Sequence, residues 1–206
     1  MTNLSSQVYD VIVIGGGVVG CAILRELSKY ELKVLLLERA SDVCEGTSKA
    51  NSAIIHTGFD AKPGTLEAKL VAESSRIFPR LAEELKIPFA PVGAVLVARS
   101  DEEAAKLPAL KAQGEQNGVD DLVILTRDEV LAREPNVDPS VKAGLLVPRE
   151  SIACGFTTVV AYAENALANG ASILLDAPVT AIRLEKSGAG GETGDTGGAG
   201  PGGGGS

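Results

Sequence analysis

The sequence predicts an α/β fold with a mostly parallel sheet, and three observations indicate it. The 206 residues are 45% hydrophobic and 22% charged, which is typical of a globular chain rather than a disordered or collagen-like one. Short apolar runs alternate with amphipathic segments along residues 9–184, which is the pattern of strands joined by crossover helices. No run of about 18 apolar residues is present, so the sequence predicts no membrane-spanning helix.

The first part of the chain predicts a β-α-β unit. We expect a buried strand over residues 9–14, because this short β-branched run ends in glycines. Residues 18–30 follow with apolar side chains at near-helical spacing, and residues 33–37 form a second apolar run. A unit of about 30 residues in this order places two parallel strands in one sheet.

The rest of the chain continues the alternation. We expect helices over residues 66–85, 102–117, 127–133 and 157–169, and strands over residues 89–98, 122–125, 144–147, 172–175 and 179–184. Pro79 and Pro108 lie within two of these helices, so we expect a kink at the first and an interruption at the second. Residues 187–206 contain 11 of the 24 glycines and no large apolar residue, which predicts a disordered tail.

Charge and cysteine content exclude several classes of partner. The net charge of -8 disfavours nucleic acids and anionic membrane surfaces, because both attract basic patches. The three cysteines, Cys21, Cys44 and Cys154, have no CxxC spacing, so we expect neither a disulfide scaffold nor a metal site. The first residues show no leader peptide, and we therefore expect a cytoplasmic location.

A glycine-rich turn connects the first expected strand to the first expected helix. Gly15, Gly17 and Gly20 have GxGxxG spacing, which permits a tight turn, close approach of the backbone to a pyrophosphate, and close packing of the helix. Val19 lies within this turn and is an expected cofactor contact. Glu38 ends the second strand, where a carboxylate accepts hydrogen bonds from an adenosine ribose, although a solvated strand end is the alternative. The sequence predicts a dinucleotide site and leaves FAD and NAD open.

A dense polar stretch, DVCEGTSKANSAIIHTGFDAKPGTLEAKL, follows the second strand. Thr47, Ser48 and Asn51 carry hydroxyl and amide groups where the middle of a dinucleotide is expected, and the alternative is a polar turn that caps a helix near Lys49. His56 is the only histidine and a candidate general base. The alternative for His56 is a histidine that only hydrogen-bonds within the fold or packs beside the cofactor.

The glycine turn and this polar stretch together resemble the D-amino-acid oxidase family of FAD-dependent oxidoreductases. The segment GTSKANSAIIHTGFDAKPGTLEAKL is most similar to the glycerol-3-phosphate dehydrogenase type of that family. The resemblance implies FAD as the cofactor. It implies that Glu38 and Arg39 surround the adenosine ribose, and that Thr47 and Ser48 line the pyrophosphate and the approach to the flavin. It also implies that the backbone near Val179 meets the adenine.

The resemblance further implies a Rossmann-like FAD-binding domain that is interrupted by part of a mixed α+β substrate domain. The FAD-binding domain is expected in residues 1–88 and again in residues 151–186, the partial substrate domain in residues 89–150, and the glycine-rich tail in residues 187–206. Members of the family continue with a later glycine-aspartate pair at the ribityl chain and with phosphate-binding arginines. We therefore expect a C-terminally truncated chain, whose sheet a partner chain could complete.

The activity that the resemblance implies is oxidation of a secondary alcohol by hydride transfer to flavin N5. The expected reaction converts sn-glycerol 3-phosphate to dihydroxyacetone phosphate, with His56 as the base for the hydroxyl proton. An L-2-hydroxy acid such as 2-hydroxyglutarate is the alternative substrate, and a truncated, non-catalytic nucleotide-binding remnant is the alternative function. The electron acceptor (a quinone, oxygen or another carrier) stays open.

Overall fold

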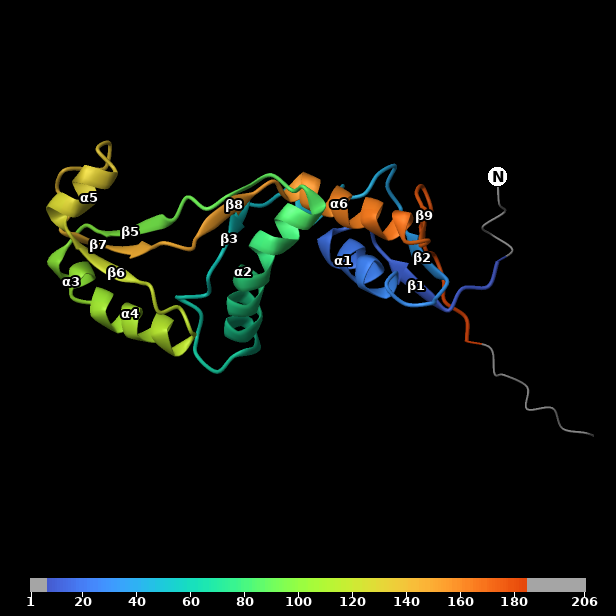
Figure 1. Cartoon of the computed structure of the whole chain (residues 1–206), viewed down its shortest axis with the longest axis horizontal. Coiled ribbons are helices and arrows are strands. Elements are labelled where there is room, and N and C mark those ends of the chain that lie inside the picture. The colour runs from blue at the N-terminus through green and yellow to red at the C-terminus, as the bar shows by residue number, and fades with distance from the viewer. Residues whose placement is uncertain (1–6, 185–206) are drawn as a thin grey trace, which may run out of the picture.

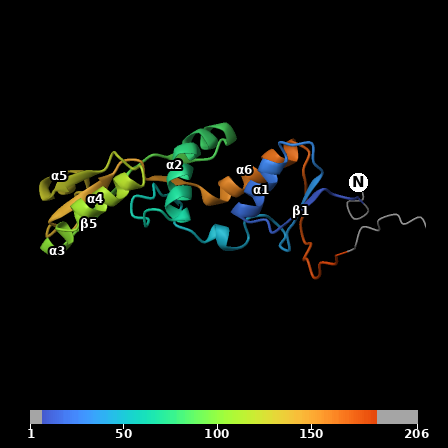
Figure 2. The same ribbon diagram turned by 90° about the horizontal axis from the view of Figure 1, so that it is seen from below.

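The computed structural model describes residues 7–184, which form an elongated molecule with a lobe at each end and a long helix between them (Figure 1). One lobe contains residues 11–37 and 155–174, and the other contains residues 94–147. The view from below shows the same separation, with the long helix α2 (Leu66–Leu85) between the two lobes (Figure 2). None of the helices within residues 7–184 is both long enough and apolar enough to cross a membrane.

The first lobe contains a three-stranded parallel sheet in the order β1-β2-β9. Its elements are β1 (Val11–Ile14), α1 (Val18–Leu27), β2 (Val34–Leu37), α6 (Gly155–Ala168) and β9 (Ser172–Leu174). Strand β1 pairs with β2 from Val11↔Val34 to Ile14↔Leu37. Helices α1 and α6 pack against each other, and their apolar residues join those of the sheet in one core. This parallel sheet with its crossover helix confirms the predicted Rossmann-like fold.

The second lobe contains an antiparallel sheet in the order β5-β7-β6. Its elements are β5 (Ala94–Ala98), α3 (Asp101–Ala104), α4 (Leu107–Gln116), β6 (Val123–Thr126), α5 (Arg127–Arg133) and β7 (Ala143–Val147). Helix α5 begins at a capping box, in which Thr126 and Glu129 each accept a backbone hydrogen bond from the other residue. Two apolar clusters of this lobe are separate from the core of the parallel sheet.

A third sheet and helix α2 lie between the lobes. The sheet is antiparallel, in the order β3-β8-β4, and contains β3 (Ile54–Ile55), β4 (Phe89–Ala90) and β8 (Ser151–Ala153). Helix α2 (Leu66–Leu85) has the predicted bounds, and it begins where the Thr65 hydroxyl accepts a hydrogen bond from the N–H of Ala68. Pro79 lies inside this helix, and the ribbon bends along its length in both views (Figures 1 and 2).

Three predicted elements differ from the structure. The strand expected over residues 89–98 is two strands in different sheets, because Gly93 between them has a φ of 71°, which a continuous strand does not allow. The helix expected over residues 102–117 is divided into α3 and α4, with Pro108 in the first turn of α4. The strand expected over residues 179–184 is wrong: these residues form no strand, and Leu184 is 96% exposed. The predicted tail, residues 187–206, lies outside the described residues.

Candidate functional site

The glycine turn at the end of β1 is open on one side and tightly packed on the other. Gly15 has a φ of 105°, and a Cβ atom at this position would meet no heavy atom within 4 Å. Gly20 lies against the turn itself, because a Cβ atom there would lie 1.9 Å from the backbone oxygen of Gly15. The first turn of α1 therefore rests directly on the Gly15 carbonyl, and the open side of the turn is free to receive a ligand.

The N-terminus of α1 presents backbone N–H groups that its N-cap residue does not satisfy. Gly17 is the N-cap residue and offers no side-chain acceptor, and the first turn holds no acidic residue. The N–H of Val18 donates to the hydroxyl of Ser48 at 2.9 Å. Within residues 7–184, the N–H groups of Gly17, Val19 and Gly20 donate to no acceptor. Free donors at a helix N-terminus bind anions, so this arrangement fits a pyrophosphate.

The carboxylate of Glu38 lies at the same turn. Its Oε2 accepts the N–H of Gly16, and its Oε1 accepts the N–H of Ala40 at 2.8 Å. These hydrogen bonds, that of Gly16 first, hold the pKa of Glu38 below its usual value. An ionised carboxylate keeps further lone pairs on both oxygens, so Glu38 remains able to accept ribose hydroxyls.

A cavity of about 380 Å³ opens beside this carboxylate. Its lining residues come from the ends of β1 and β2 and from the segment after β9: Ile14, Gly15, Leu37, Glu38, Arg39, Ala177, Pro178 and Val179. The volume lies within the range of small-ligand sites, and the position is the carboxyl edge of a parallel sheet, where such folds bind ligands. A larger hollow of about 860 Å³ lies between α2 and the end of α4, and no residue of the glycine turn lines it.

The structure brings together some of the predicted cofactor residues and leaves others apart. Gly15, Glu38, Arg39 and Val179 share the cavity, although Val179 lies in a segment without the predicted strand. Val19 is 69% exposed in the first turn of α1.

The loop with Thr47, Ser48 and Asn51 forms a single 3-10 turn, Thr47–Lys49, and the α-helix considered near Lys49 is absent. Ser48 reaches α1, and a Cβ atom at Gly17 would lie 3.0 Å from its hydroxyl. Asn51 bonds within its own loop, because its Oδ1 accepts the N–H of Ala53 at 2.7 Å and its Nδ2 donates to the Ser48 carbonyl. Thr47 is exposed.

His56 follows β3 and does not line the cavity at the glycine turn. Its Nδ1 lies 3.2 Å from Oε2 of Glu150, with the imidazole 56% exposed and the carboxylate side chain 6% exposed. Glu150 was not predicted from the sequence, because no motif contains it and its partner Thr57 is 93 residues away along the chain. Pairing of β3 with β8 is the feature that brings the two segments together. No cluster of three or more His, Cys, Asp or Glu that could hold a metal ion occurs in the described part of the chain.

Comparison with known proteins gives a consistent result. Residues 10–200 match the DAO family, which is described as FAD dependent oxidoreductases. A glycerol 3-phosphate dehydrogenase of Caloramator mitchellensis is 46% identical over 180 residues, which are 87% of this chain and 38% of that protein. An L-2-hydroxyglutarate dehydrogenase of Dictyostelium discoideum is 35% identical over 142 residues, which are 68% of this chain and 32% of that protein.

A solved structure has the same fold. The dithionite-reduced L-α-glycerophosphate oxidase of Mycoplasma pneumoniae, with FAD bound, has a TM-score of 0.78 and 33% sequence identity. The match covers 82% of this chain and 45% of that chain. The chain therefore spans less than half the length of the relatives described here.

Proposed function

Because this chain belongs to the DAO family of FAD-dependent oxidoreductases, we propose that its glycine turn binds the ADP half of FAD and that it serves the oxidation of sn-glycerol 3-phosphate. One observation carries the cofactor proposal: free N–H groups at the start of α1 lie beside the ionised Glu38 carboxylate. Both groups lie at the carboxyl edge of the parallel sheet. The free N–H groups match the pyrophosphate of an adenosine diphosphate, and the carboxylate matches its ribose.

The residues of the turn have separate parts in binding. The N–H groups of Gly17 and Val19 hold the pyrophosphate, and the absence of a side chain at Gly17 lets the phosphate oxygens approach. Glu38 accepts the ribose hydroxyls and repels a 2′-phosphate, which favours FAD over a phosphorylated dinucleotide. Val179 lines the cavity beside Glu38, and we assign the backbone near it to the adenine.

Bound FAD supplies a hydride acceptor at N5 for the carbon that carries the substrate hydroxyl. The protein must remove the hydroxyl proton, and His56 is the residue that we propose for this step. The alcohol loses a hydride and a proton, so glycerol 3-phosphate becomes dihydroxyacetone phosphate. The Glu150 carboxylate lies 3.2 Å from the imidazole and is its ion-pair partner when the ring is protonated.

The substrate proposal is supported by the relatives. The protein of C. mitchellensis that is 46% identical is a glycerol 3-phosphate dehydrogenase, which favours glycerol 3-phosphate. The relative of D. discoideum that is 35% identical is an L-2-hydroxyglutarate dehydrogenase, so this 2-hydroxy acid is the second candidate. Both substrates are anionic secondary alcohols and require the same hydride and proton transfers.

Visible absorbance of the purified chain tests the proposal. We expect flavin bands in the protein fraction, and we expect anaerobic glycerol 3-phosphate to bleach them. Bleaching by L-2-hydroxyglutarate alone would replace the first substrate with the second. A flavin-bound protein that neither compound bleaches would contradict the proposed activity, and a folded, colourless protein that takes up no added FAD would indicate a non-catalytic remnant.

A further inference from the structure

Glu150 is a buried carboxylate whose two oxygens face different partners. Its Oε1 accepts hydrogen bonds from both the N–H of Thr57, at 2.7 Å, and the hydroxyl of Thr57, at 3.0 Å. Its Oε2 lies 3.2 Å from Nδ1 of His56, so the imidazole is the charged or polar partner that faces this oxygen. Thr57 is fully buried, so water does not compete for its two contacts with Oε1. A buried carboxylate in this setting needs donors on both oxygens, and His56 is the donor available to Oε2.

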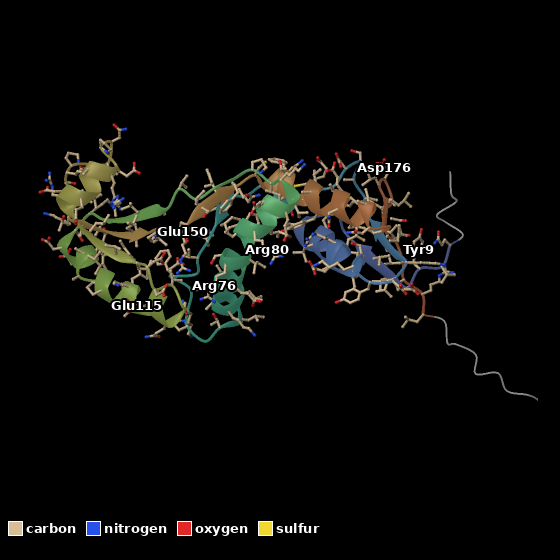
Figure 3. All side chains as sticks on the ribbon, viewed as in Figure 1. Tyr9, Arg76, Arg80, Glu115, Glu150 and Asp176 are labelled. Atoms are coloured by element: carbon tan, nitrogen blue, oxygen red, sulfur yellow. The ribbon has the colours of Figure 1, made fainter. Side chains whose placement is uncertain are left out.

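The fold holds this arrangement from two sides. Strands β3 and β8 pair in antiparallel register at Ile55↔Ser151, which places the residues that follow β3 opposite the residue that precedes β8. The backbone oxygen of Glu150 accepts the N–H of Gly93 at 2.8 Å, so the residue is tied to the start of β5 as well. Figure 3 shows Glu150 between the two lobes, where β7 leads into β8.

We propose that Glu150 is a positioning residue that fixes the tautomer of His56. A carboxylate can only accept hydrogen bonds, so it holds the imidazole proton on Nδ1 and leaves the lone pair on Nε2. The nitrogen that takes the substrate proton is then Nε2. The use of Nε2 as a base rests on the proposed function, whereas the tautomer itself does not.

The single histidine of the chain allows a direct test by NMR. Long-range ¹H–¹⁵N correlations of protein labelled with ¹⁵N-histidine report which ring nitrogen carries the proton, and no other histidine signal overlaps. For the wild-type chain, at a pH where the ring is neutral, we expect the proton on Nδ1. Neutral histidine free in water prefers the proton on Nε2, so the expected spectrum is the reverse of that of the free amino acid.

The Glu150→Gln variant should reverse the tautomer. The amide side chain that replaces the carboxylate keeps an oxygen for the two bonds from Thr57, and its NH₂ group then faces His56 as a donor. Nδ1 must accept that hydrogen bond, so the proton moves to Nε2. Thr57→Val is the matched control, because it removes the hydroxyl donor to Oε1 and leaves Oε2 opposite the imidazole. We expect this control to keep the proton on Nδ1.

The outcomes separate this proposal from the proposed function. A wild-type spectrum with the proton on Nε2, or an unchanged tautomer in folded Glu150→Gln, would overturn the role of Glu150. If that variant does not fold, the wild-type spectrum decides alone. The measurement needs neither FAD nor substrate, so a protein with the Nδ1–H tautomer that no alcohol reduces would contradict the proposed function and leave the role of Glu150 intact.

Discussion

The Glu38 carboxylate accepts a hydrogen bond from the backbone N–H of Gly16, so the end of β2 is bonded directly to the glycine turn. The expected ribose acceptor is therefore also a structural part of the turn. Glu38 can serve both as a ribose acceptor and as a structural part of the turn. The bond from Gly16 uses only one lone pair of one oxygen, and the carboxylate stays ionised. This link also means that changes at Glu38 affect stability as well as cofactor binding.

The packing of Gly20 on Gly15 predicts an unusual effect of alanine. In an ordinary helix, a change from Gly to Ala stabilises by about 1 kcal/mol. Here the new Cβ would lie 1.9 Å from a backbone oxygen that cannot rotate away, so we expect Gly20→Ala to destabilise by about 2–3 kcal/mol. Urea unfolding measures this, with Gly46→Ala as the control, because a Cβ atom there meets nothing within 4 Å. Equal stability of Gly20→Ala and the wild type would contradict the packing.

Glu38 predicts a pH dependence of stability. Its pKa in the folded protein is lowered by the hydrogen bonds from Gly16 and Ala40, below a value of about 4.3 in the unfolded chain. The charge therefore stabilises the fold above the unfolded-state pKa, and this contribution is lost as the pH falls through the folded-state pKa. We expect Glu38→Gln to be less stable than the wild type at pH 7, with a smaller difference in acid.

Denaturant titrations of Glu38→Gln and the wild type, at pH 7 and at an acidic pH below the unfolded-state pKa of Glu38, measure the stability difference. Glu164→Gln, on the exposed surface of α6, is the control. A stability difference between Glu38→Gln and the wild type that does not change with pH would show that the Glu38 charge makes no such contribution.

The Cys154 thiol should react before the other two thiols. The hydroxyl of Thr157 donates to Sγ of Cys154 at 3.2 Å, and this bond lowers the pKa of the Cys154 thiol. Burial raises the pKa of Cys21 to about 11 and also raises that of Cys44. At pH 8, we expect iodoacetamide to modify Cys154 first, with the other two thiols protected until the chain unfolds.

Mass spectrometry of partially alkylated protein identifies the modified residue. Thr157→Val should slow the reaction of Cys154 several-fold, because the thiol pKa rises. Thr158→Val is the matched control, since its hydroxyl donates to the backbone oxygen of Cys154 instead of the sulfur. Early modification of Cys21 would contradict the prediction.

His56→Ala should separate binding from chemistry. Because His56 does not line the cavity at the glycine turn, we expect FAD affinity to remain unchanged. If the imidazole takes the substrate proton, bleaching of the flavin by substrate should slow by about 10²–10⁴-fold. Stopped-flow absorbance measures the rate, and a loss of only a few-fold would assign His56 a role in scaffolding alone.

Much of the first lobe could be predicted because its signals are local. The glycine turn, the apolar runs on either side and the crossover helix all lie within 30 residues. Outside this lobe, α2 and α5 also have the predicted bounds. The apolar residues in 179–184 also have the composition of a strand, but a strand needs a neighbour. Within the described residues, none pairs with this segment, because the chain turns away after β9 at Asp176, whose φ is 52°.

Other features depend on contacts between distant parts of the chain. Strands β3 and β8 have two and three residues, too few for a pattern to be recognised, yet their pairing brings Glu150 to His56. The division into domains at residues 88 and 150 stays a prediction. The cytoplasmic location and the partner chain also stay predictions.

Binding of FAD at the glycine turn is the central claim, and a calorimetric titration of FAD into the wild-type chain tests it most directly. We predict one FAD per chain, competition by ADP because the turn binds only the ADP half, and no binding by Gly17→Val, whose side chain fills the space of the pyrophosphate. FAD binding that ADP does not displace and that Gly17→Val leaves unchanged would place the cofactor elsewhere and contradict the account.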